Sequence, residues 1–344
     1  MSKRLILCCD GTWNTAEQKS PTNVTKLYDA LAREDAAGTE QRSFYHAGVG
    51  VQSSERIRGG AFGFGLSRNV KDTYRFIVEN FEPGDELFLF GFSRGAFTAR
   101  STAGFVRNSG ILRRENIDRV DQAYTLYRSR SAHPRGEEAQ SFRATYSHET
   151  RIRFIGVWDT VGALGVPLSP TRWVNFINRR WQFHDTDLST KVDAAFHALA
   201  IDEKRPPFRP AVWSQQAGAG DQRLEQVWFA GVHGDAGGGY PDHALSDIAL
   251  LWMADRAASC GLAFDSGTFT AKPPAAPNSK GAQHETRTKF YKLLPAFVRP
   301  IGAKDAPHES VASTAVERHK DASIAYSPRG LVAYLGGPHN ETPV

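Results

Sequence analysis

Residues 86–110 read ELFLFGFSRGAFTARSTAGFVRNSG, and this stretch decides the fold. It opens with an apolar run from Leu87 that is typical of a strand buried on both faces of a sheet. It continues as a segment rich in Ala, Phe and small residues, which favours a helix. Between the two, residues 91–95 form Gly-Phe-Ser-Arg-Gly, which fits the G-x-S-x-G pattern of a nucleophile elbow. The strand–turn–helix context, more than the pentapeptide alone, predicts that Ser93 is a nucleophile.

The residue types around Ser93 fit the chemistry of an elbow. Such a turn is strained, and Gly91 and Gly95 allow neighbouring backbone to approach without Cβ clashes. The N–H of Arg94, at the start of the helix, is expected to point at the oxyanion that forms in acyl transfer. The alternative interpretation is an ordinary βα turn in which Ser93 caps the helix.

A serine nucleophile needs a histidine base and a carboxylate that fixes the base, and in elbow hydrolases they follow the serine in the order acid, histidine. Asp159 ends the apolar run RIRFIGVWD, and His233 follows the run QVWFAGV. The carboxyl ends of parallel strands meet at one edge of a sheet, where open α/β sheets bind their ligands. The sequence therefore predicts a triad of Ser93, Asp159 and His233.

Each partner of Ser93 has a competing interpretation. Asp159 also suits a residue that caps the turn after its strand. His243 lies further along the same segment as His233 and is the second candidate for the base. A third histidine, His197, lies in residues 192–201, which we interpret as a helix, and its apolar surroundings favour a core role.

The oxyanion hole needs a second donor, expected in the loop after the first strand. That loop reads DGTWN from Asp10, and it predicts that the N–H of Gly11 or Thr12 reaches the oxyanion. Asp10 is expected to hold the loop by accepting backbone N–H bonds. Asp235 is expected to stabilise the turn formed by Gly237–Gly239.

Short apolar runs alternate with helix-periodic segments along the chain. The expected strands are 4–9, 42–46, 86–92, 152–158 and 226–232, and the expected helices are 24–34, 68–81, 95–108, 192–201 and 245–258. This alternation predicts an α/β fold with a mainly parallel, doubly wound sheet and helices on both faces.

We expect residues 1–344 to form a single domain. Two regions break its pattern: a lid-like insertion at 164–189, which carries four large aromatic residues, and an exposed loop at 268–288. After that loop, residues 290–298 and a helix-like segment at 309–320 are expected to return to the main body.

Composition excludes several other classes of protein. The 344 residues carry a net charge of +5, with Lys and Arg scattered and no nucleic-acid-binding signature, so we expect no nucleic-acid partner. No apolar run reaches the 18 residues of a membrane span, and the N-terminus does not read as a secretory signal. Three Cys without a CxxC indicate reduced thiols. We expect a cytoplasmic protein, with export by a signal-independent route as an alternative.

Two rival functions remain open at this stage. A divalent ion prefers carboxylate and imidazole ligands, and the chain offers such groups without any standard metal-binding spacing, at Asp10, Asp159, His233, Asp235, Asp242, His243 and Asp247. We therefore expect no metal and no cofactor. The second rival is a binding module that keeps the scaffold but has no activity.

The segments CDGTWN, GFSRGAFTAR, GVWDTVGALG and GVHGDAGGGYPDHALSDIALLWM together resemble a bacterial family of uncharacterised α/β-hydrolases. That family includes the phospholipase effectors delivered by type VI secretion. The late segment HESVASTAVERHKDASIAYSPRGL is similar to its C-terminal pattern, so the resemblance runs from Lys3 to about Leu331. It implies an α/β-hydrolase fold and a Ser–Asp–His esterase or lipase, with Ser93, Asp159 and His233 on the matching motif positions.

Together these features predict a carboxylic ester hydrolase. Its expected partner is a small-molecule or lipid ester, with phospholipid acyl esters among the candidates. Peripheral membrane contact is expected, if anywhere, through the aromatic stretch 164–189. The sequence does not indicate the acyl-chain length or head group of the substrate, or the oligomeric state of the protein.

Overall fold

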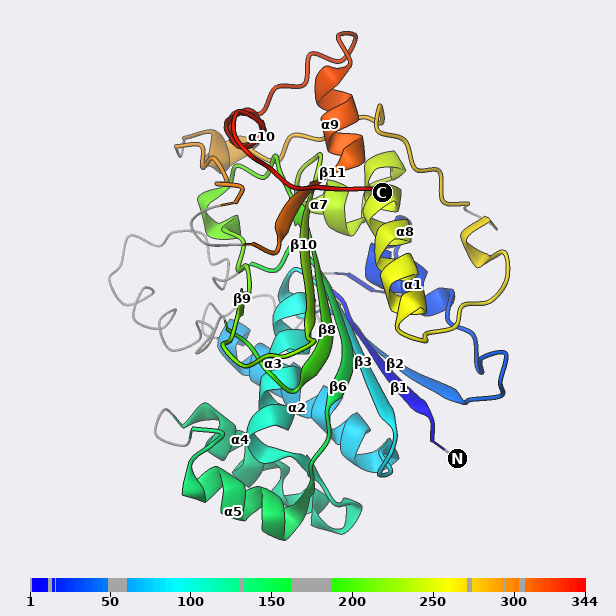
Figure 1. Cartoon of the computed structure of the whole chain (residues 1–344), viewed down its shortest axis with the longest axis vertical. Helices are drawn as coiled ribbons and strands as arrows, with labels where there is room; N and C mark the ends of the chain where they lie inside the picture. The colour runs from blue at the N-terminus through cyan, green and yellow to red at the C-terminus, as the bar shows by residue number, and fades with distance from the viewer. Residues whose placement is uncertain are drawn as a thin grey trace.

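The computed structural model describes residues 2–11, 14–15, 17–48, 61–129, 133–161, 187–270, 274–293, 295–302 and 307–344. Its centre is an eight-stranded sheet, ordered β2-β1-β3-β6-β8-β10-β11-β12, in which every neighbouring pair is parallel (Figure 1). The strands are β1 Arg4–Cys9, β2 Gln41–His46, β3 Glu86–Phe92, β6 Ile152–Trp158, β8 Val192–Ala200, β10 Arg223–Phe229, β11 Glu309–Ala312 and β12 Glu341–Thr342. The predicted parallel α/β architecture is confirmed.

The strand order reverses direction between β1 and β3. From β1 the chain passes to β2 on one side, whereas β3 and all later strands of the sheet are added on the other side. Such a switch point opens a crevice at the carboxyl ends of the two strands, and open α/β sheets bind ligands there. Ser93 follows β3 and Asp10 follows β1, so the topology places both residues at this crevice.

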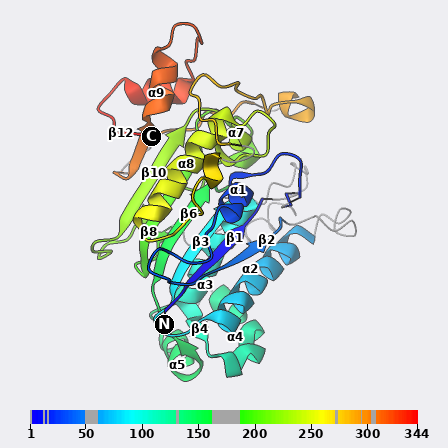
Figure 2. The same cartoon turned by 90° about the vertical axis from the view of Figure 1, so that its right-hand side faces the viewer.

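Helices cover both faces of the sheet. α2 (Ala61–Asn80) and α3 (Arg94–Ser109) lie on one face, and α1 (Asn23–Asp29) and α8 (Ala244–Ser259) lie on the other (Figure 2). Successive residues of a strand point to opposite faces. In β3 the phenylalanines 88, 90 and 92 therefore join the core under α8, while the leucines 87 and 89 join the core under α2 and α3.

Smaller elements complete the fold. The helices α4 and α5 and the antiparallel pair β4–β5 lie together at one end of the molecule (Figure 1). The remaining elements are β4 Ile111–Leu112, η2 Arg114–Arg119, α4 Val120–Arg128, α5 Glu137–Tyr146, β5 Ser147–His148, β7 Asp187–Leu188, η3 Pro206–Phe208, β9 Ser214–Gln215, α7 His233–Gly237, η4 Thr268–Thr270, η5 Lys289–Leu293, α9 Ser313–Lys320 and α10 Arg329–Leu335.

One predicted helix is wrong. Residues 192–201 contain the central strand β8, paired with β6 on one side and β10 on the other. The segment is rich in Ala and almost wholly buried, so it lacks the polar–apolar alternation that marks a half-buried strand. Pairing with two neighbours overrides the helical propensity of its alanines. The helix-like segment 309–320 divides in the same way, into β11 and α9.

The lid-like insertion predicted at 164–189 lies almost entirely outside the described residues. The loop predicted at 268–288 is described at 268–270, which form η4, and at 274–288, which contain no strand or helix. No helix among the described ranges is long and apolar enough to cross a bilayer. All three cysteines are buried free thiols.

Candidate active site

The turn that carries Ser93 is strained in the way an elbow requires. Ser93 has φ 57° and ψ −116°, a backbone conformation that side-chain-bearing residues rarely adopt. A Cβ at position 91 would lie 2.5 Å from the carbonyl oxygen of Gly95, and a Cβ at position 95 would overlap the carbonyl oxygen of Cys9. Only glycine at both positions allows β1, β3 and α3 to meet this closely.

Three side chains form one hydrogen-bonded line at this edge of the sheet. The Ser93 Oγ lies 2.8 Å from Nε2 of His233, and Nδ1 of the same ring lies 2.5 Å from Oδ2 of Asp159. Asp159 directly follows β6, and His233 opens α7 shortly after β10. The structure thus brings together the three residues that the sequence placed at strand ends.

Burial differs along that line. Asp159 is fully buried, whereas Ser93 and His233 keep 8% of their surface exposed. The rings of Phe92 and Phe208 flank the imidazole, with ring centroids 4.6 Å and 5.0 Å away. The acid is therefore shielded from water, while the serine and the histidine keep a small exposed surface.

The sequence did not predict the cation that faces the acid. The Arg299 guanidinium is fully buried and donates to both carboxylate oxygens of Asp159, at 2.5 Å and 3.0 Å. The N–H of Ala200 donates a further hydrogen bond to the same carboxylate, at 3.1 Å. Burial alone would raise the pKa of Asp159, but the Arg299 charge and the His233 hydrogen bond outweigh it and hold that pKa well below its usual range. The carboxylate is therefore ionised across the physiological range.

Arg299 also ties separate loops to the site. Its two terminal nitrogens donate to the carbonyl oxygens of Ala200, at 2.8 Å, and Phe208, at 2.5 Å. The residue lies 140 positions after Asp159, in a segment without helix or strand. No motif surrounds it in the sequence, so only the folded chain reveals the pair.

The loop after β1 is organised around Asp10. One carboxylate oxygen accepts the N–H of Gly11 at 2.6 Å, and the other accepts hydroxyls of Thr22, Thr25 and Tyr45 at 2.6, 3.0 and 2.7 Å. The amide of Gly11 is thus already engaged by a carboxylate. Thr12, the other predicted donor, lies outside the described residues, and Arg94 is the first residue of α3.

The second histidine considered for the base forms a pair of its own. Nδ1 of His243 lies 2.5 Å from Oδ2 of Asp247, whose other oxygen accepts from Lys26 Nζ at 2.7 Å. His197 lies on β8, where its Nε2 accepts the N–H of Thr160 at 3.1 Å. Burial, helped by the charge of Arg100, lowers the pKa of His197 to about 3, so this ring is neutral in the core.

Asp235 differs from its predicted role. Its carboxylate accepts the N–H of Val232, at 2.9 Å, and contacts Nδ1 of His284 at 2.6 Å. It therefore fixes the start of α7 and the segment around His284, and not the Gly237–Gly239 turn. A Cβ at Gly237 would overlap the ring of Phe92, so that glycine is needed for packing beside the imidazole.

The candidate metal ligands are dispersed. Asp159, Asp235 and Asp247 are each paired with a different histidine, so they do not converge on one point. Over the described ranges, no group of three or more His, Cys, Asp or Glu is placed to hold a metal ion.

A strained serine after a central strand of a parallel sheet, with a histidine and an aspartate in line, defines an α/β-hydrolase. The family model described as "T6SS, Phospholipase effector Tle1-like, catalytic domain" matches residues 3–256, and the chain belongs to that family. Arg299 lies beyond the matched range.

The chain is also similar to individual proteins. A Saccharomyces cerevisiae protein, "Uncharacterized protein YEL023C", is 30% identical over 231 residues, which are 60% of this chain and 32% of that protein. The chain thus spans about a third of this relative's length.

Solved structures give lower similarities. An uncharacterized protein from Pseudomonas aeruginosa is 17% identical, with TM-score 0.47 over 81% of this chain and 49% of that one. A Tle1 effector bound to the VgrG spike of the type 6 secretion system is 19% identical, with TM-score 0.42 over 70% and 52%. Thermogutta terrifontis esterase 2 is 13% identical, with TM-score 0.41 over 76% and 85%.

Proposed function

We propose that this chain hydrolyses carboxylic esters with Ser93 as nucleophile, His233 as general base and acid, and Asp159 as the carboxylate that fixes the imidazole. The observation that carries the proposal is the line Ser93–His233–Asp159, with contacts of 2.8 Å and 2.5 Å. A hydroxyl is a weak nucleophile at neutral pH, and this arrangement removes its proton as it attacks.

The reaction runs in two halves. In the first, Ser93 Oγ attacks the ester carbonyl while Nε2 of His233 takes the hydroxyl proton. The imidazolium then gives that proton to the leaving alcohol, and the acyl group stays on Ser93. In the second half, His233 takes a proton from water, the resulting hydroxide attacks the acyl carbon, and the proton returns to Ser93 as the acid leaves.

The ionised Asp159 supports the charge that appears on His233. Its hydrogen bond to Nδ1 selects the tautomer that leaves Nε2 free to accept a proton, and its negative charge stabilises the imidazolium. For the oxyanion we propose the N–H groups of Arg94 and Thr12, each worth about 3 kcal/mol of transition-state stabilisation. Gly11, whose own N–H is held by Asp10, allows the loop to approach closely.

Phospholipid acyl esters are the substrate class that we propose first. The family description names phospholipase effectors, and a lipase-type site suits an ester presented at a lipid surface. Export through a type VI secretion apparatus is part of the same proposal, because a Tle1 effector has been seen bound to a VgrG spike.

Labelling with a fluorophosphonate tests the mechanism before any substrate is known. Purified protein is treated in the presence of a chelator, and its intact mass is compared with that of Ser93→Ala. We expect a single adduct on the wild type and none on the variant. An unlabelled wild type, or equal labelling of Ser93→Ala, would overturn the assignment of Ser93.

Substrate class is tested with matched esters. We expect hydrolysis of nitrophenyl esters and release of fatty acid from phosphatidylcholine or phosphatidylethanolamine vesicles, both in chelator. Hydrolysis of the small esters without any fatty acid release would restrict the proposal to soluble esters. Activity that disappears in chelator and returns with a divalent ion would replace the triad by metal catalysis.

A further inference from the structure

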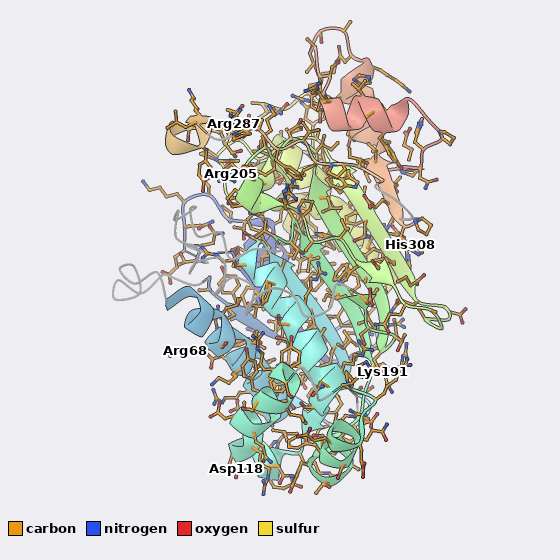
Figure 3. All side chains as sticks on the ribbon, turned by 90° about the vertical axis from the view of Figure 1, so that its left-hand side faces the viewer. Arg68, Asp118, Lys191, Arg205, Arg287 and His308 are labelled. Atoms are coloured by element: carbon orange, nitrogen blue, oxygen red, sulfur yellow. The ribbon has the colours of Figure 1, made fainter. Side chains whose placement is uncertain are left out.

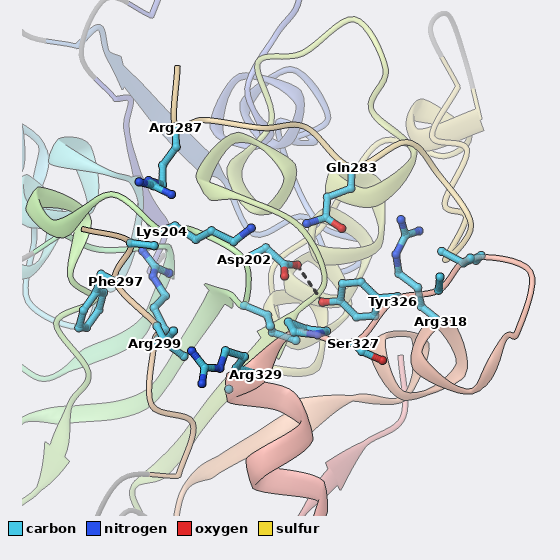
Figure 4. A pocket seen from close by; sticks show the side chains of 17 residues that line it. Asp202, Lys204, Gln283, Arg287, Phe297, Arg299, Arg318, Tyr326, Ser327 and Arg329 are labelled. Atoms are coloured by element: carbon cyan, nitrogen blue, oxygen red, sulfur yellow. Dashed lines mark hydrogen bonds between the residues drawn. The ribbon is translucent and has the colours of Figure 1, made fainter. Parts of the chain in front are cut away.

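A cavity of about 540 Å³ lies outside the Ser93 site, near the carboxyl end of β8 (Figure 4). Three parts of the chain line it: the loop after β8, residues within 283–299, and residues within 318–330, from the end of α9 to the start of α10. Figure 4 shows that charged side chains from all three parts surround the same space.

The lining is strongly basic. It includes five cationic side chains, Lys204, Arg287, Arg299, Arg318 and Arg329, and a single carboxylate, Asp202. That carboxylate is engaged locally, since one of its oxygens accepts the N–H of Gly231 at 2.7 Å and the hydroxyl of Tyr326 at 2.8 Å. Carboxylates outside the lining balance a further part of this charge: Asp159 pairs with Arg299, and an oxygen of Glu285 lies 3.9 Å from Nζ of Lys204. The balance is therefore only partial.

Arg318 shows the imbalance most clearly. Only 5% of the residue is exposed, and one terminal nitrogen donates to the carbonyl oxygens of Ser279 and Gly281, at 2.5 Å and 2.9 Å. These partners are neutral. In the part of the chain that the structure describes, no carboxylate forms a salt bridge with Arg318, although its charge acts on the neighbouring Asp202, and its Nε is buried without a hydrogen-bond partner.

A buried N–H without an acceptor is costly, and more so when it belongs to a charged group. The Nε of Arg299, which lines the same cavity, likewise has no partner among the described residues, although its terminal nitrogens hold Asp159. Two buried guanidinium N–H groups beside one basic cavity indicate that an anion completes it.

The rest of the lining indicates what kind of chemical group carries the anion. Phe297, Val298, Ile324 and Pro328 form apolar parts of the wall, and the volume exceeds that of an inorganic ion. We propose that this cavity binds an organic phosphate monoester, whose phosphate lies against the guanidinium of Arg318. Lys204 and Arg329 add positive potential, and the organic part lies against the apolar wall. Phosphate suits this lining because it offers several acceptor oxygens and up to two negative charges.

The cavity and the Ser93 site share Arg299, so binding is tested on Ser93→Ala protein, which removes turnover and keeps that arginine. Glycerol 3-phosphate and inorganic phosphate are titrated by calorimetry in phosphate-free buffer, with glycerol as the uncharged comparison. We expect one glycerol 3-phosphate per chain, weaker binding of inorganic phosphate and none of glycerol. Arg318→Met should weaken binding about tenfold or more, the loss expected for one charge-assisted hydrogen bond.

The matched control is Arg68→Gln. Arg68 is an exposed residue of α2, well below Arg205 and Arg287 in the view of Figure 3, and its replacement should leave binding unchanged. Arg329→Gln, an exposed residue of the cavity, should weaken binding several-fold without any risk to folding. If no phosphate probe binds, or if Arg318→Met binds as well as the wild type, the proposal is overturned.

A thermal melt distinguishes loss of the site from loss of the fold. Arg318→Met removes the two hydrogen bonds to Ser279 and Gly281, so its melting temperature without ligand should fall by a few degrees, and a cooperative transition shows that the fold is kept. Glycerol 3-phosphate should raise the melting temperature of the parent and not that of the variant. A variant that responds to ligand like its parent would again contradict the proposal.

The phosphate can be free or carried by a lipid head group, and vesicles separate these sources. Flotation with phosphatidylcholine vesicles, with and without phosphatidic acid, is compared for the parent and Arg318→Met. Recruitment that needs both phosphatidic acid and Arg318, without soluble binding, supports the site with a lipid ligand. Binding of glycerol 3-phosphate without recruitment to vesicles supports a free metabolite as the ligand. Recruitment that is the same for the parent and for Arg318→Met counts against the site.

Discussion

Two histidine–aspartate pairs lie in this molecule with almost the same geometry. Nδ1 of His233 is 2.5 Å from Asp159, and Nδ1 of His243 is 2.5 Å from Asp247. Both aspartate side chains are fully buried, and both histidines lie at the start of a helix. By hydrogen bonding and burial alone, either pair could hold a catalytic imidazole.

The pairs differ in what lies around them. Nε2 of His233 meets the hydroxyl of Ser93 on its strained turn, whereas His243 pairs with Asp247, which Lys26 of α1 also contacts. The cations differ as well: Arg299 contacts both oxygens of its aspartate, and a lysine contacts one oxygen of the other. A buried histidine–aspartate pair can thus be purely structural. It suits catalysis where a nucleophile lies next to Nε2 of the histidine, as Ser93 does here.

The largest expected effect separates the two histidines. Ser93→Ala and His233→Ala should each lower kcat for a nitrophenyl ester by about 10⁵-fold or more, because triad members act as a unit. His243→Ala should stay within about threefold of the wild type. Initial rates with folded, mass-verified proteins test this, and an inactive His243→Ala beside an active His233→Ala would reverse the assignment.

The two aspartates give the next comparison. Asp159→Asn should reduce kcat by about 10⁴-fold, because an amide in place of the carboxylate favours the wrong imidazole tautomer and removes the charge that supports the imidazolium. Asp247→Asn changes the same group in the other pair and should leave kcat close to that of the wild type. Equal losses of kcat in both variants, with both folded, would show that the site depends on the two pairs together.

The sequence alone predicts the parts of this site that consist of neighbouring residues. Gly91, Ser93 and Gly95 are adjacent, and the elbow needs small residues at those positions, so the turn was predictable. Asp159 and His233 could be placed because each follows an apolar strand, and parallel strands end at one edge.

Features that depend on distant contacts could not be predicted. Arg299 comes from a segment without secondary structure, 140 residues after its partner, and an arginine in such a segment carries no sequence signal. The strand at 192–200 resembled a helix because burial on both faces removes the alternation that identifies strands. His243 was left open as a base because only the fold shows that it binds Asp247.

A third comparison removes the cation from the active-site pair. Arg299→Met leaves Asp159 as a buried charge without a counter-ion, so it should lower the free energy of unfolding at pH 7 by about 3–5 kcal/mol. The activity should fall too, because Asp159 is no longer held in place against the imidazole of His233. Urea unfolding followed by circular dichroism gives the stability, and Arg299→Lys, which keeps the charge, should recover part of it.

The same variant has an expected pH dependence. The pKa of Asp159 in the folded protein lies below the value of about 3.9 in unfolded chains. The ion pair therefore contributes stability that is fully present above that value and is lost as the pH falls toward the folded pKa. In Arg299→Met, burial raises the pKa of Asp159, so the carboxyl is neutral at pH 3. The stability difference from the wild type should therefore be smaller at pH 3 than at pH 7, and an equal difference would contradict the ion pair.

The smallest effect is expected for the cation of the other pair. Lys26 is partly buried and contacts one oxygen of Asp247, which keeps its bond to His243 and an N–H from Ala276 at 2.8 Å when the lysine is removed. Lys26→Met should therefore lower the free energy of unfolding by only about 1–2 kcal/mol and leave kcat unchanged. Urea unfolding and ester kinetics on the same preparation measure both quantities. If Lys26→Met lowers the free energy of unfolding as much as Arg299→Met does, the two cations stabilise the protein equally. The bidentate contact and full burial of Arg299 would then make no difference to stability.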